Sequence, residues 1–245
     1  RDVYRIMKQR SFFFYDVLDN TMLEYQRLQE TQQGLICVRA GTQADGVGRS
    51  DKVWLSPPGG LWFTFDIEHP TMVPSFGLYI GYCLHHALSK SFAPLSGKLQ
   101  IKWTNDIMYQ GKKLGGLLCK HAGNKYIVGI GINTNNVIDE SLGKFGAVAL
   151  KDILGFEVSN DELCRGLINA VENHEKAMAH EITYITYCNE HLFGRNCQVT
   201  IDVGTSPFSA EILGIDLHGA LIIRKDMGEI VNLHAGSIMS VQAFS

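Results

Sequence analysis

Residues 99–133 read LQIKWTNDIMYQGKKLGGLLCKHAGNKYIVGIGIN, and their apolar runs separated by turn residues indicate β-sheet structure. Three runs rich in apolar residues, at 99–103, 115–119 and 126–133, are separated by Gly, Asn and Lys, so three strands are predicted. Gly129 and Gly131 alternate within the last strand. Alternate glycines leave one strand face bare, which either admits a flat ligand or allows a bulge or tight packing.

Upstream and downstream of this stretch, strand-like and helix-like segments alternate. Strands are predicted at 35–38 and 61–65, and helices at 21–30, at 71–90 and from Ser159 onward. Thr21 with Glu24, and Ser159 with Glu162, fit the capping box that starts a helix. A sheet with helices at its side predicts an α+β fold.

The pattern changes near Arg195. Short alternating apolar runs follow, separated by turn residues at 204–207, 218–219, 226–228 and 235–236. Five short strands at this spacing predict a small β-barrel of about 50 residues. We therefore expect two domains, residues 1–194 and 195–245.

Composition restricts the function classes. The chain has 245 residues, 45% hydrophobic and 19% charged, which is typical of a globular protein. A net charge of −3 argues against bulk nucleic-acid binding, and no run approaches the roughly 20 apolar residues of a membrane span. Six cysteines without a C-x-x-C pair favour reduced thiols and a cytoplasmic location. The sequence begins at Arg1, so an upstream targeting segment, including an organellar one, is left open.

The loop from Gln43 to Ser50 is polar and rich in glycine. Glycines allow backbone amides to approach an anion, and Arg49 can pair with a phosphate. A flexible surface connection is the alternative. The loop lacks the G-x-x-x-x-G-K-[ST] pattern of a Walker loop.

A second polar cluster follows the strand at 99–103. Lys102, Asn105 and Asp106 at a strand end are able to position and polarise a ligand, although a solvated turn is equally compatible with them. Lys113 precedes Gly115-Gly116 and can place a fixed positive charge where negative charge develops, or lie in a plain basic hairpin.

Two other motifs fail on spacing. Gly129-Ile-Gly-Ile-Asn133 lacks the third glycine and the following helix of a dinucleotide site. His174 and His180 are six residues apart and do not share a helix face, so a zinc-protease site is rejected and no metal-ligand set is predicted.

Taken in order, these motifs resemble the biotin protein ligases, also called holocarboxylase synthetases. The family pattern is a glycine- and arginine-rich loop running into Trp and Ser-Pro, then K-W-x-N-D, K-x-G-G and G-x-G-I-N. Here these are residues 46–57, 102–106, 113–116 and 129–133. The resemblance spans about residues 15–245. It implies a mixed-sheet catalytic domain of the biotin/lipoate ligase type followed by an SH3-like barrel.

The resemblance also implies the reaction. Biotin and ATP would form biotinyl-5′-AMP, with Mg²⁺ accompanying ATP, and the biotinyl group would pass to a lysine of a biotin carboxyl carrier domain of a carboxylase. No enzyme nucleophile is needed, because catalysis would rest on positioning and electrostatics. A homodimer is compatible with this expectation.

The resemblance implies site residues one by one. Asn20 and Thr21 match the pair that binds the ureido end of biotin, Gln43 begins the loop, and Trp54 lies near adenine. Gly46, Gly48 and Arg49 match the loop that closes over the biotin carboxylate and the adenylate phosphate. Lys113 matches the lysine that contacts both of those groups, and Asp106 the carboxylate proposed to help deprotonate the acceptor lysine. Gly116, Gly131 and Asn133 match the pocket floor and an adenylate contact. The catalytic set is thus Lys113, Arg49 and Asp106, and the strand-end Lys102 and Asn105 are added to the expected binding residues.

The sequence departs from the family pattern in several places. Val47 and Ser50 stand where some members carry arginine or glycine, so we expect weaker retention of the adenylate. Asn20 replaces Ser. Thr104 replaces the usual proline, which we expect to loosen a turn. Residues 145–150 lack the usual Thr-Ser-Leu, so an adenine-side contact should differ. No helix-turn-helix precedes residue 15, so no repressor role is expected unless a segment upstream of Arg1 supplies one.

Two other functions are compatible with parts of the pattern. A lipoate–protein ligase shares the adenylate chemistry but lacks this Gly-Arg loop followed by Trp and Ser-Pro. A non-catalytic adaptor module would have no electrostatic need for both Arg49 and Lys113.

Overall fold

The computed structural model describes residues 10–49, 52–138 and 145–242, and for residues 175 and 176 it describes the backbone alone. In the first 195 residues the strands are β1 (Arg10–Leu18), β2 (Leu35–Gln43), β3 (Leu61–Glu68), β4 (Leu99–Lys102), β5 (Asp106–Tyr109), β6 (Lys112–Ala122) and β7 (Lys125–Ile132). The helices are α1 (Thr21–Gln29), α2 (Phe76–Ser91), the 3₁₀ turn η2 (Ala93–Leu95), α3 (Leu150–Leu154), α4 (Asn160–Asn173), α5 (Glu175–Met178) and α6 (Glu181–Glu190).

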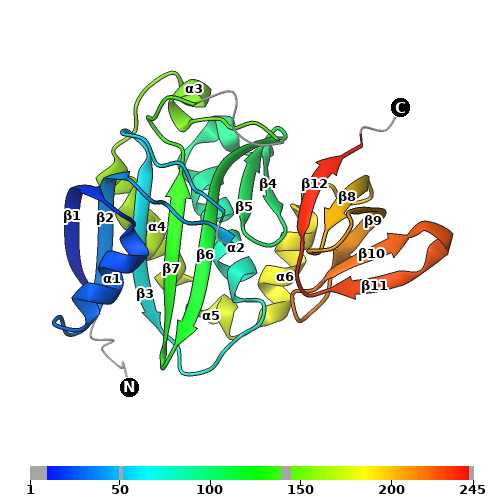
Figure 1. Cartoon of the computed structure of the whole chain (residues 1–245), viewed down its shortest axis with the longest axis horizontal. Helices are drawn as coiled ribbons and strands as arrows, with labels where there is room; N and C mark the ends of the chain where they lie inside the picture. Colours follow the sequence, from blue (N-terminus) through cyan, green and yellow to red (C-terminus); the bar gives the residue numbers. More distant parts are fainter. Residues whose placement is uncertain (1–9, 50–51, 139–144, 243–245) are drawn as a thin grey trace.

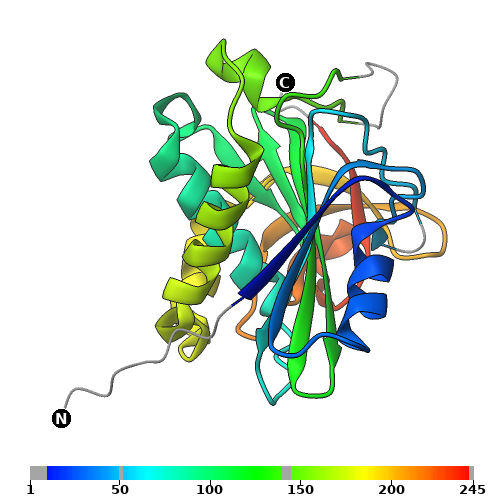
Figure 2. The same cartoon turned by 90° about the vertical axis from the view of Figure 1, so that its left-hand side faces the viewer.

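The seven strands form one mixed sheet in the order β1-β2-β3-β7-β6-β5-β4 (Figure 1). β1 and β2 are parallel and joined through α1, whereas the other neighbours are antiparallel. Helices α2 and α4 cover one face and α1 lies on the other (Figure 2). The main core lies between the sheet and α2, α4 and α6, and a smaller one lies under α1 around Tyr25 and Ile36. The predicted α+β fold is confirmed.

The predicted strands at 35–38, 61–65, 99–103, 115–119 and 126–133 are all present, with altered ends. Two boundaries were wrong. The α2 helix begins at Phe76 rather than 71, after Pro74, because proline disfavours helical backbone in the residue before it. The N-cap of α1 is Asn20 rather than Thr21: the Asn20 side chain accepts a hydrogen bond from the Leu23 amide at 2.8 Å.

A fully buried carboxylate, Asp66, ties the edge of the sheet together. Its Oδ1 accepts hydrogen bonds from Arg10 at 3.0 Å and from the amide of Ile36 at 2.7 Å. Its Oδ2 accepts from Tyr25 at 3.0 Å and from Lys125 at 2.7 Å. Two cations and two neutral donors satisfy the charge, which would be costly if left unpaired at this depth. Elements β1, α1, β2, β3 and β7 are thereby joined at one point.

The C-terminal part forms a second sheet. The strands are β8 (Gln198–Asp202), β9 (Phe208–Ile215), β10 (Leu221–Lys225), β11 (Ile230–Leu233) and β12 (Ser237–Val241), antiparallel in the order β11-β10-β9-β8-β12, with the 3₁₀ turn η3 (Asp226–Gly228) between β10 and β11. The five predicted strands are confirmed, as is the cap at Ser159, whose Oγ accepts from the amide of Glu162 at 3.3 Å. The SH3-like assignment and the division at residue 195 stay predictions.

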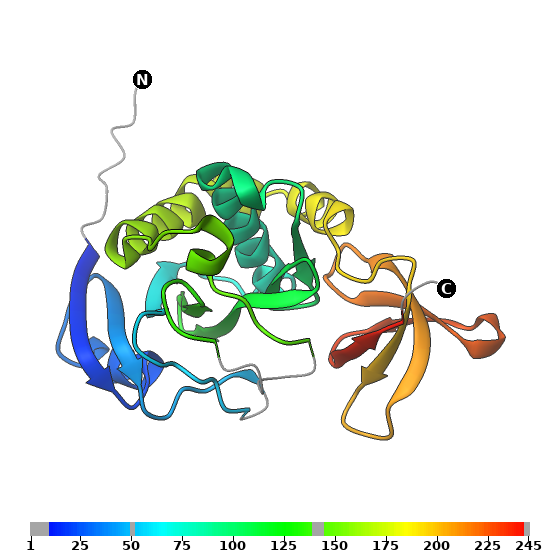
Figure 3. The ribbon, with the colours of Figure 1, turned by 90° about the horizontal axis from the view of Figure 1, so that it is seen from above.

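The second sheet lies beyond the β4 edge of the first (Figures 1 and 3). Residues 191–193 bond along β4, with the Ile101 amide donating to the His191 carbonyl at 2.8 Å and the Phe193 amide to the Ile101 carbonyl at 2.9 Å. Trp103 Nε1 donates to the Gly219 carbonyl at 2.9 Å. Among the described residues, no helix is long and apolar enough to cross a membrane.

Candidate functional site

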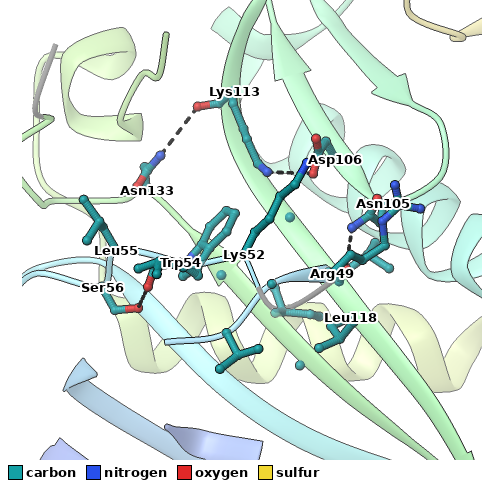
Figure 4. Close-up of a pocket in the computed structure, with 18 of the residues that line it drawn as sticks. Arg49, Lys52, Trp54, Leu55, Ser56, Asn105, Asp106, Lys113, Leu118 and Asn133 are labelled. Atoms are coloured by element: carbon teal, nitrogen blue, oxygen red, sulfur yellow. Dashed lines mark hydrogen bonds and ion pairs between the residues drawn. The ribbon is translucent and has the colours of Figure 1, made fainter. Parts of the chain in front are cut away.

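A cavity of about 1310 Å³ opens on the face of the sheet that carries α1. It lies between strands β5–β7, the start of α1 and the segment that follows β2. Figure 4 shows Trp54 and Ser56 of that segment beside Lys113. Thirteen of the fourteen predicted site residues line it: Asn20, Thr21, Gln43, Gly48, Arg49, Trp54, Lys102, Asn105, Asp106, Lys113, Gly116, Gly131 and Asn133. Motifs spread over more than a hundred residues therefore meet in one place.

Gly46 is the exception, because it does not line the cavity. It is buried in the neck of the loop, where a Cβ atom would come within 2.2 Å of the Trp54 carbonyl oxygen. The Trp54 amide donates to the Gly46 carbonyl at 2.7 Å, and Gly48 donates to the Lys52 carbonyl at 2.7 Å. The absence of a side chain at Gly46 thus allows the two arms of the loop to pair, which carries Arg49 towards the cavity.

One end of the cavity is a neutral hydrogen-bond network. Gln43 Oε1 accepts from the Thr21 amide at 2.9 Å and from Thr21 Oγ1 at 3.1 Å, and Gln43 Nε2 donates to Ser56 Oγ at 2.7 Å. Thr21 Oγ1 also lies 2.8 Å from Thr64 Oγ1. Asn20 caps α1 and donates to the Asp45 carbonyl at 3.2 Å, so its polar atoms already have protein partners. Thr21 and Gln43 are likewise bonded to each other and to Thr64 and Ser56, so this end of the cavity presents neutral polar groups that are already ordered.

The predicted bare strand face is covered by an indole. Gly131 and Gly116 lie side by side on β7 and β6, and a Cβ atom on either would touch Trp54, at 2.6 and 3.1 Å respectively. Trp54 Nε1 is buried and has no hydrogen-bond partner among the described residues. Lys113 Nζ lies 4.5 Å from the centre of the Trp54 ring. The glycine floor therefore receives a flat aromatic group, as alternate glycines allow.

The other end of the cavity is cationic. Asp106 Oδ1 pairs with Lys113 Nζ at 2.8 Å, and Oδ2 pairs with Lys102 Nζ at 3.2 Å (Figure 4 shows the Lys113 pair). Burial alone would raise the pKa of Asp106, but its two lysine partners outweigh burial and lower that pKa below its ordinary value. Burial lowers the pKa of Lys102, and Asp106 opposes that change. One carboxylate thus holds two ammonium groups at the end of β4 and the start of β6.

Arg49 adds a third cation to this end. Its Nη1 donates to Thr104 Oγ1 at 2.8 Å, and its Nη2 donates to the Gly236 carbonyl at 2.7 Å and to Ser237 Oγ at 3.3 Å. The charges of Arg49, Lys102 and Lys113 exceed that of Asp106 by two. Such a cavity favours an anion, above all a phosphate or a carboxylate.

The two predicted asparagines support the backbone of the site. Asn105 Nδ2 donates to the Leu117 carbonyl at 3.0 Å, which joins the β4–β5 turn to β6. Asn133 Oδ1 accepts from Asn136 Nδ2 at 3.1 Å, and the backbone N–H of Asn133 donates to the Leu114 carbonyl at 2.9 Å. Both contacts fix the strand ends that carry Asp106 and Lys113.

Several lining residues were missed by the motif reasoning. Lys52 and Lys120 line the cavity from exposed positions. Phe145 also lines it, and the centre of its ring lies 4.6 Å from Lys102 Nζ. Ser237, Ile238 and Met239 come from the second sheet. Only the family comparison of residues 145–150 pointed towards Phe145, and no local pattern singles out residues 237–239. Val47 lines the cavity as an exposed apolar residue, and Ser50 lies outside the described residues.

Comparisons with known proteins agree with this architecture. The model of the biotin/lipoate A/B protein ligase family matches residues 14–135, and that of the biotin protein ligase C-terminal domain matches residues 192–239. Biotin–protein ligase 2 of Arabidopsis thaliana is 32% identical over 135 residues, which are 51% of this chain and 39% of that protein. A biotin–[acetyl-CoA-carboxylase] ligase of Paracoccus denitrificans is 26% identical over 228 residues, covering 87% of this chain and 94% of that protein.

Among solved structures, a biotin protein ligase from Aquifex aeolicus in complex with biotin and ATP superposes with a TM-score of 0.79 at 24% identity, covering 95% of this chain and 98% of that one. At this identity the likeness establishes the fold. The two family models together match most of the chain, in the order of its two sheets. The chain therefore belongs to the biotin/lipoate A/B protein ligase family.

Proposed function

We propose that this protein is an ATP-dependent ligase that activates biotin as biotinyl-5′-AMP and transfers it to a lysine of a biotin carboxyl carrier domain. The observation that carries the proposal is the polarity of the cavity. A neutral hydrogen-bond network around Thr21 and Gln43 lies at one end, and a cluster of three cations lies at the other. Biotin has the matching polarity, with a neutral ureido ring at one end and a carboxylate at the other.

In the first step, a carboxylate oxygen of biotin bonds to the α-phosphorus of ATP, and the bond from that phosphorus to the bridging oxygen breaks to release pyrophosphate. Negative charge gathers where the two anions meet. Lys113 and Arg49 line this region of the cavity, so we assign them to stabilise the charge of the carboxylate and the α-phosphate. Trp54 and the glycines beneath it would contact the adenine side.

In the second step, the amine of the acceptor lysine attacks the carbonyl carbon of the mixed anhydride, the bond from that carbon to the phosphate oxygen breaks so that AMP leaves, and the amine proton passes to solvent. Asp106 was expected to help remove the proton from that amine. Its two lysine partners lower its pKa, and a carboxylate with a lowered pKa accepts a proton poorly. We therefore propose that Asp106 positions Lys102 and Lys113.

The Mg²⁺ expected with ATP does not fit a site built by the protein. The carboxylates among the lining residues are Asp45 and Asp106, and Asp106 is engaged by two lysines. No three His, Cys, Asp or Glu side chains gather to hold a metal within the described ranges. Because Mg²⁺ commonly binds substrate phosphates and few protein ligands, we propose that it arrives with ATP, and no step is derived through it.

The acceptor is proposed to be the carrier domain of an acetyl-CoA carboxylase, as the name of the Paracoccus relative suggests. The match spans only 39% of the Arabidopsis relative, so the partner and the activity of the whole protein are proposals. We also propose, from the sequence alone, that the protein forms a homodimer, that it is cytoplasmic and that its two domains divide at residue 195.

Exchange of radiolabel between pyrophosphate and ATP tests the first step. It should depend on biotin and be absent with lipoate or without an acid. Lipoate-dependent exchange would move the assignment to lipoate–protein ligase, and no exchange with either acid would favour the adaptor module. Transfer is then measured with a carrier domain as acceptor, with a version lacking the target lysine as the control.

A further inference from the structure

Arg49 is oriented by three groups from two distant parts of the chain. Thr104 lies in the β4–β5 turn. The backbone N–H of Asn105 closes this turn by donating to the Lys102 carbonyl at 3.1 Å. Ser237 begins β12 of the C-terminal sheet and pairs with Asp202 of β8, and Gly236 directly precedes that strand. The loop arginine therefore spans the junction between the two sheets.

All three partners of the Arg49 guanidinium are neutral: a hydroxyl, a carbonyl and a second hydroxyl. The nearby anion, Asp106, is engaged by Lys102 and Lys113. Neutral acceptors fix the direction of a guanidinium without cancelling its charge, and at least two of its five N–H groups remain for a ligand. Half-buried Arg49 is thus held as an oriented, uncompensated cation on the cavity wall.

Orientation before binding has an energetic consequence. A free arginine side chain loses much rotational freedom when it grips a phosphate, and that loss weakens binding. An arginine already held at the right place loses less. The hydroxyls of Thr104 and Ser237 are the parts of this arrangement that depend on side chains, because a valine at 104 or an alanine at 237 offers Arg49 no acceptor.

We propose that Thr104 and Ser237, with the Gly236 carbonyl, are positioning residues that hold Arg49 as a preformed binding group for the phosphates of ATP and of the adenylate. The inference rests on the proposed function and extends it: the C-terminal sheet contributes to nucleotide affinity through Arg49 and need not touch the nucleotide to do so.

The test compares Thr104→Val and Ser237→Ala with wild type in biotin-dependent ATP–pyrophosphate exchange. Removing one hydrogen bond to a charged group should raise the KM for ATP about tenfold for Thr104→Val, and less for Ser237→Ala with its longer contact, while kcat changes little. Thr104→Ser should restore the wild-type KM. Ser240→Ala is the matched control, because Ser240 lies on the same strand and bonds to Thr200 instead.

A double-mutant cycle shows whether the effect passes through Arg49. With Arg49→Ala already in place, Thr104→Val should raise the KM no further. The proposal is overturned if Thr104→Val and Ser237→Ala behave like Ser240→Ala, or if Thr104→Val has its full effect without Arg49.

Direct ATP binding by calorimetry separates this inference from the proposed function. Weaker ATP binding in Thr104→Val but not in Ser240→Ala supports the positioning role even if biotin supports no exchange, in which case the proposed function alone fails. Equal ATP affinity in all three proteins overturns the positioning role.

Discussion

Adding one methyl group at Gly131 should displace the indole of Trp54. A Cβ atom there would lie 2.6–2.8 Å from three atoms of the ring, whereas ordinary contacts are 3.4–4 Å. The ring must therefore retreat by about 1 Å or the strand must shift, since carbon atoms pack best at 3.5–4.0 Å. Overpacking of this kind costs about 1–3 kcal/mol of unfolding free energy.

Urea unfolding and tryptophan emission measure the effect of Gly131→Ala without assuming any activity. We expect a loss of about 1–3 kcal/mol, a change in the emission spectrum, and a higher KM for ATP if the proposed function holds. Gly129→Ala is the matched control on the same strand face. Its Cβ atom would meet the flexible side chain of Met22 at 3.1 Å, which can move aside at little cost. Equal stability and emission for Gly131→Ala and wild type would refute the idea that these glycines make room for the ring.

Three further perturbations have expected outcomes. Lys113→Ala should lower the rate of adenylate formation at least about tenfold, because it removes a cation from the reacting anions, whereas Lys112→Ala on the exposed neighbouring position should not; equal rates would exclude this role. Burial lowers the pKa of His85 from 6.5 to about 4, so its contribution to stability is complete above pH 6.5 and is lost as the pH falls towards 4. This contribution amounts to about 3 kcal/mol. Urea unfolding at a series of pH values should show the unfolding free energy falling between pH 6.5 and 4 in the wild type, and this fall should be absent in His85→Gln. Gly166→Ala in α4, where a Cβ atom meets nothing within 4 Å, should raise the unfolding free energy by about 0.5–1 kcal/mol, and a decrease would contradict the open space.

The sequence predicted elements whose local pattern is strong and missed those that depend on neighbours. Strand β7 and the five C-terminal strands have clear apolar runs between turn residues. β5 has four residues and is held by its neighbours β4 and β6. β1 carries three consecutive phenylalanines without alternation, and much of it is exposed, so no periodicity marks it as a strand. Its position depends on pairing with β2.

The candidate site shows the same division. The motifs identified thirteen lining residues because glycines, lysines and a tryptophan in that order leave a clear pattern. What Arg49 contacts was not predictable, because Thr104 and Ser237 are 55 and 188 residues away from it. Gly46 faces the Trp54 carbonyl rather than the cavity, and local sequence does not distinguish a glycine facing a ligand from one facing a carbonyl oxygen. The ion pairs of Asp106 likewise depend on the β4–β5–β6 pairing.

The buried Asp66 also restricts how the first strand can align. β1 is an edge strand in parallel pairing with β2, and its backbone alone would tolerate a slip of two residues, since such a slip keeps each side chain on the same face. That slip would move Arg10 by roughly 6–7 Å and take its guanidinium away from Asp66, leaving a charge at zero exposure with one cation fewer. Electrostatics therefore selects one alignment among several that hydrogen bonding accepts. The same alignment fixes where β1 ends, and hence where Asn20 and Thr21 enter the cavity.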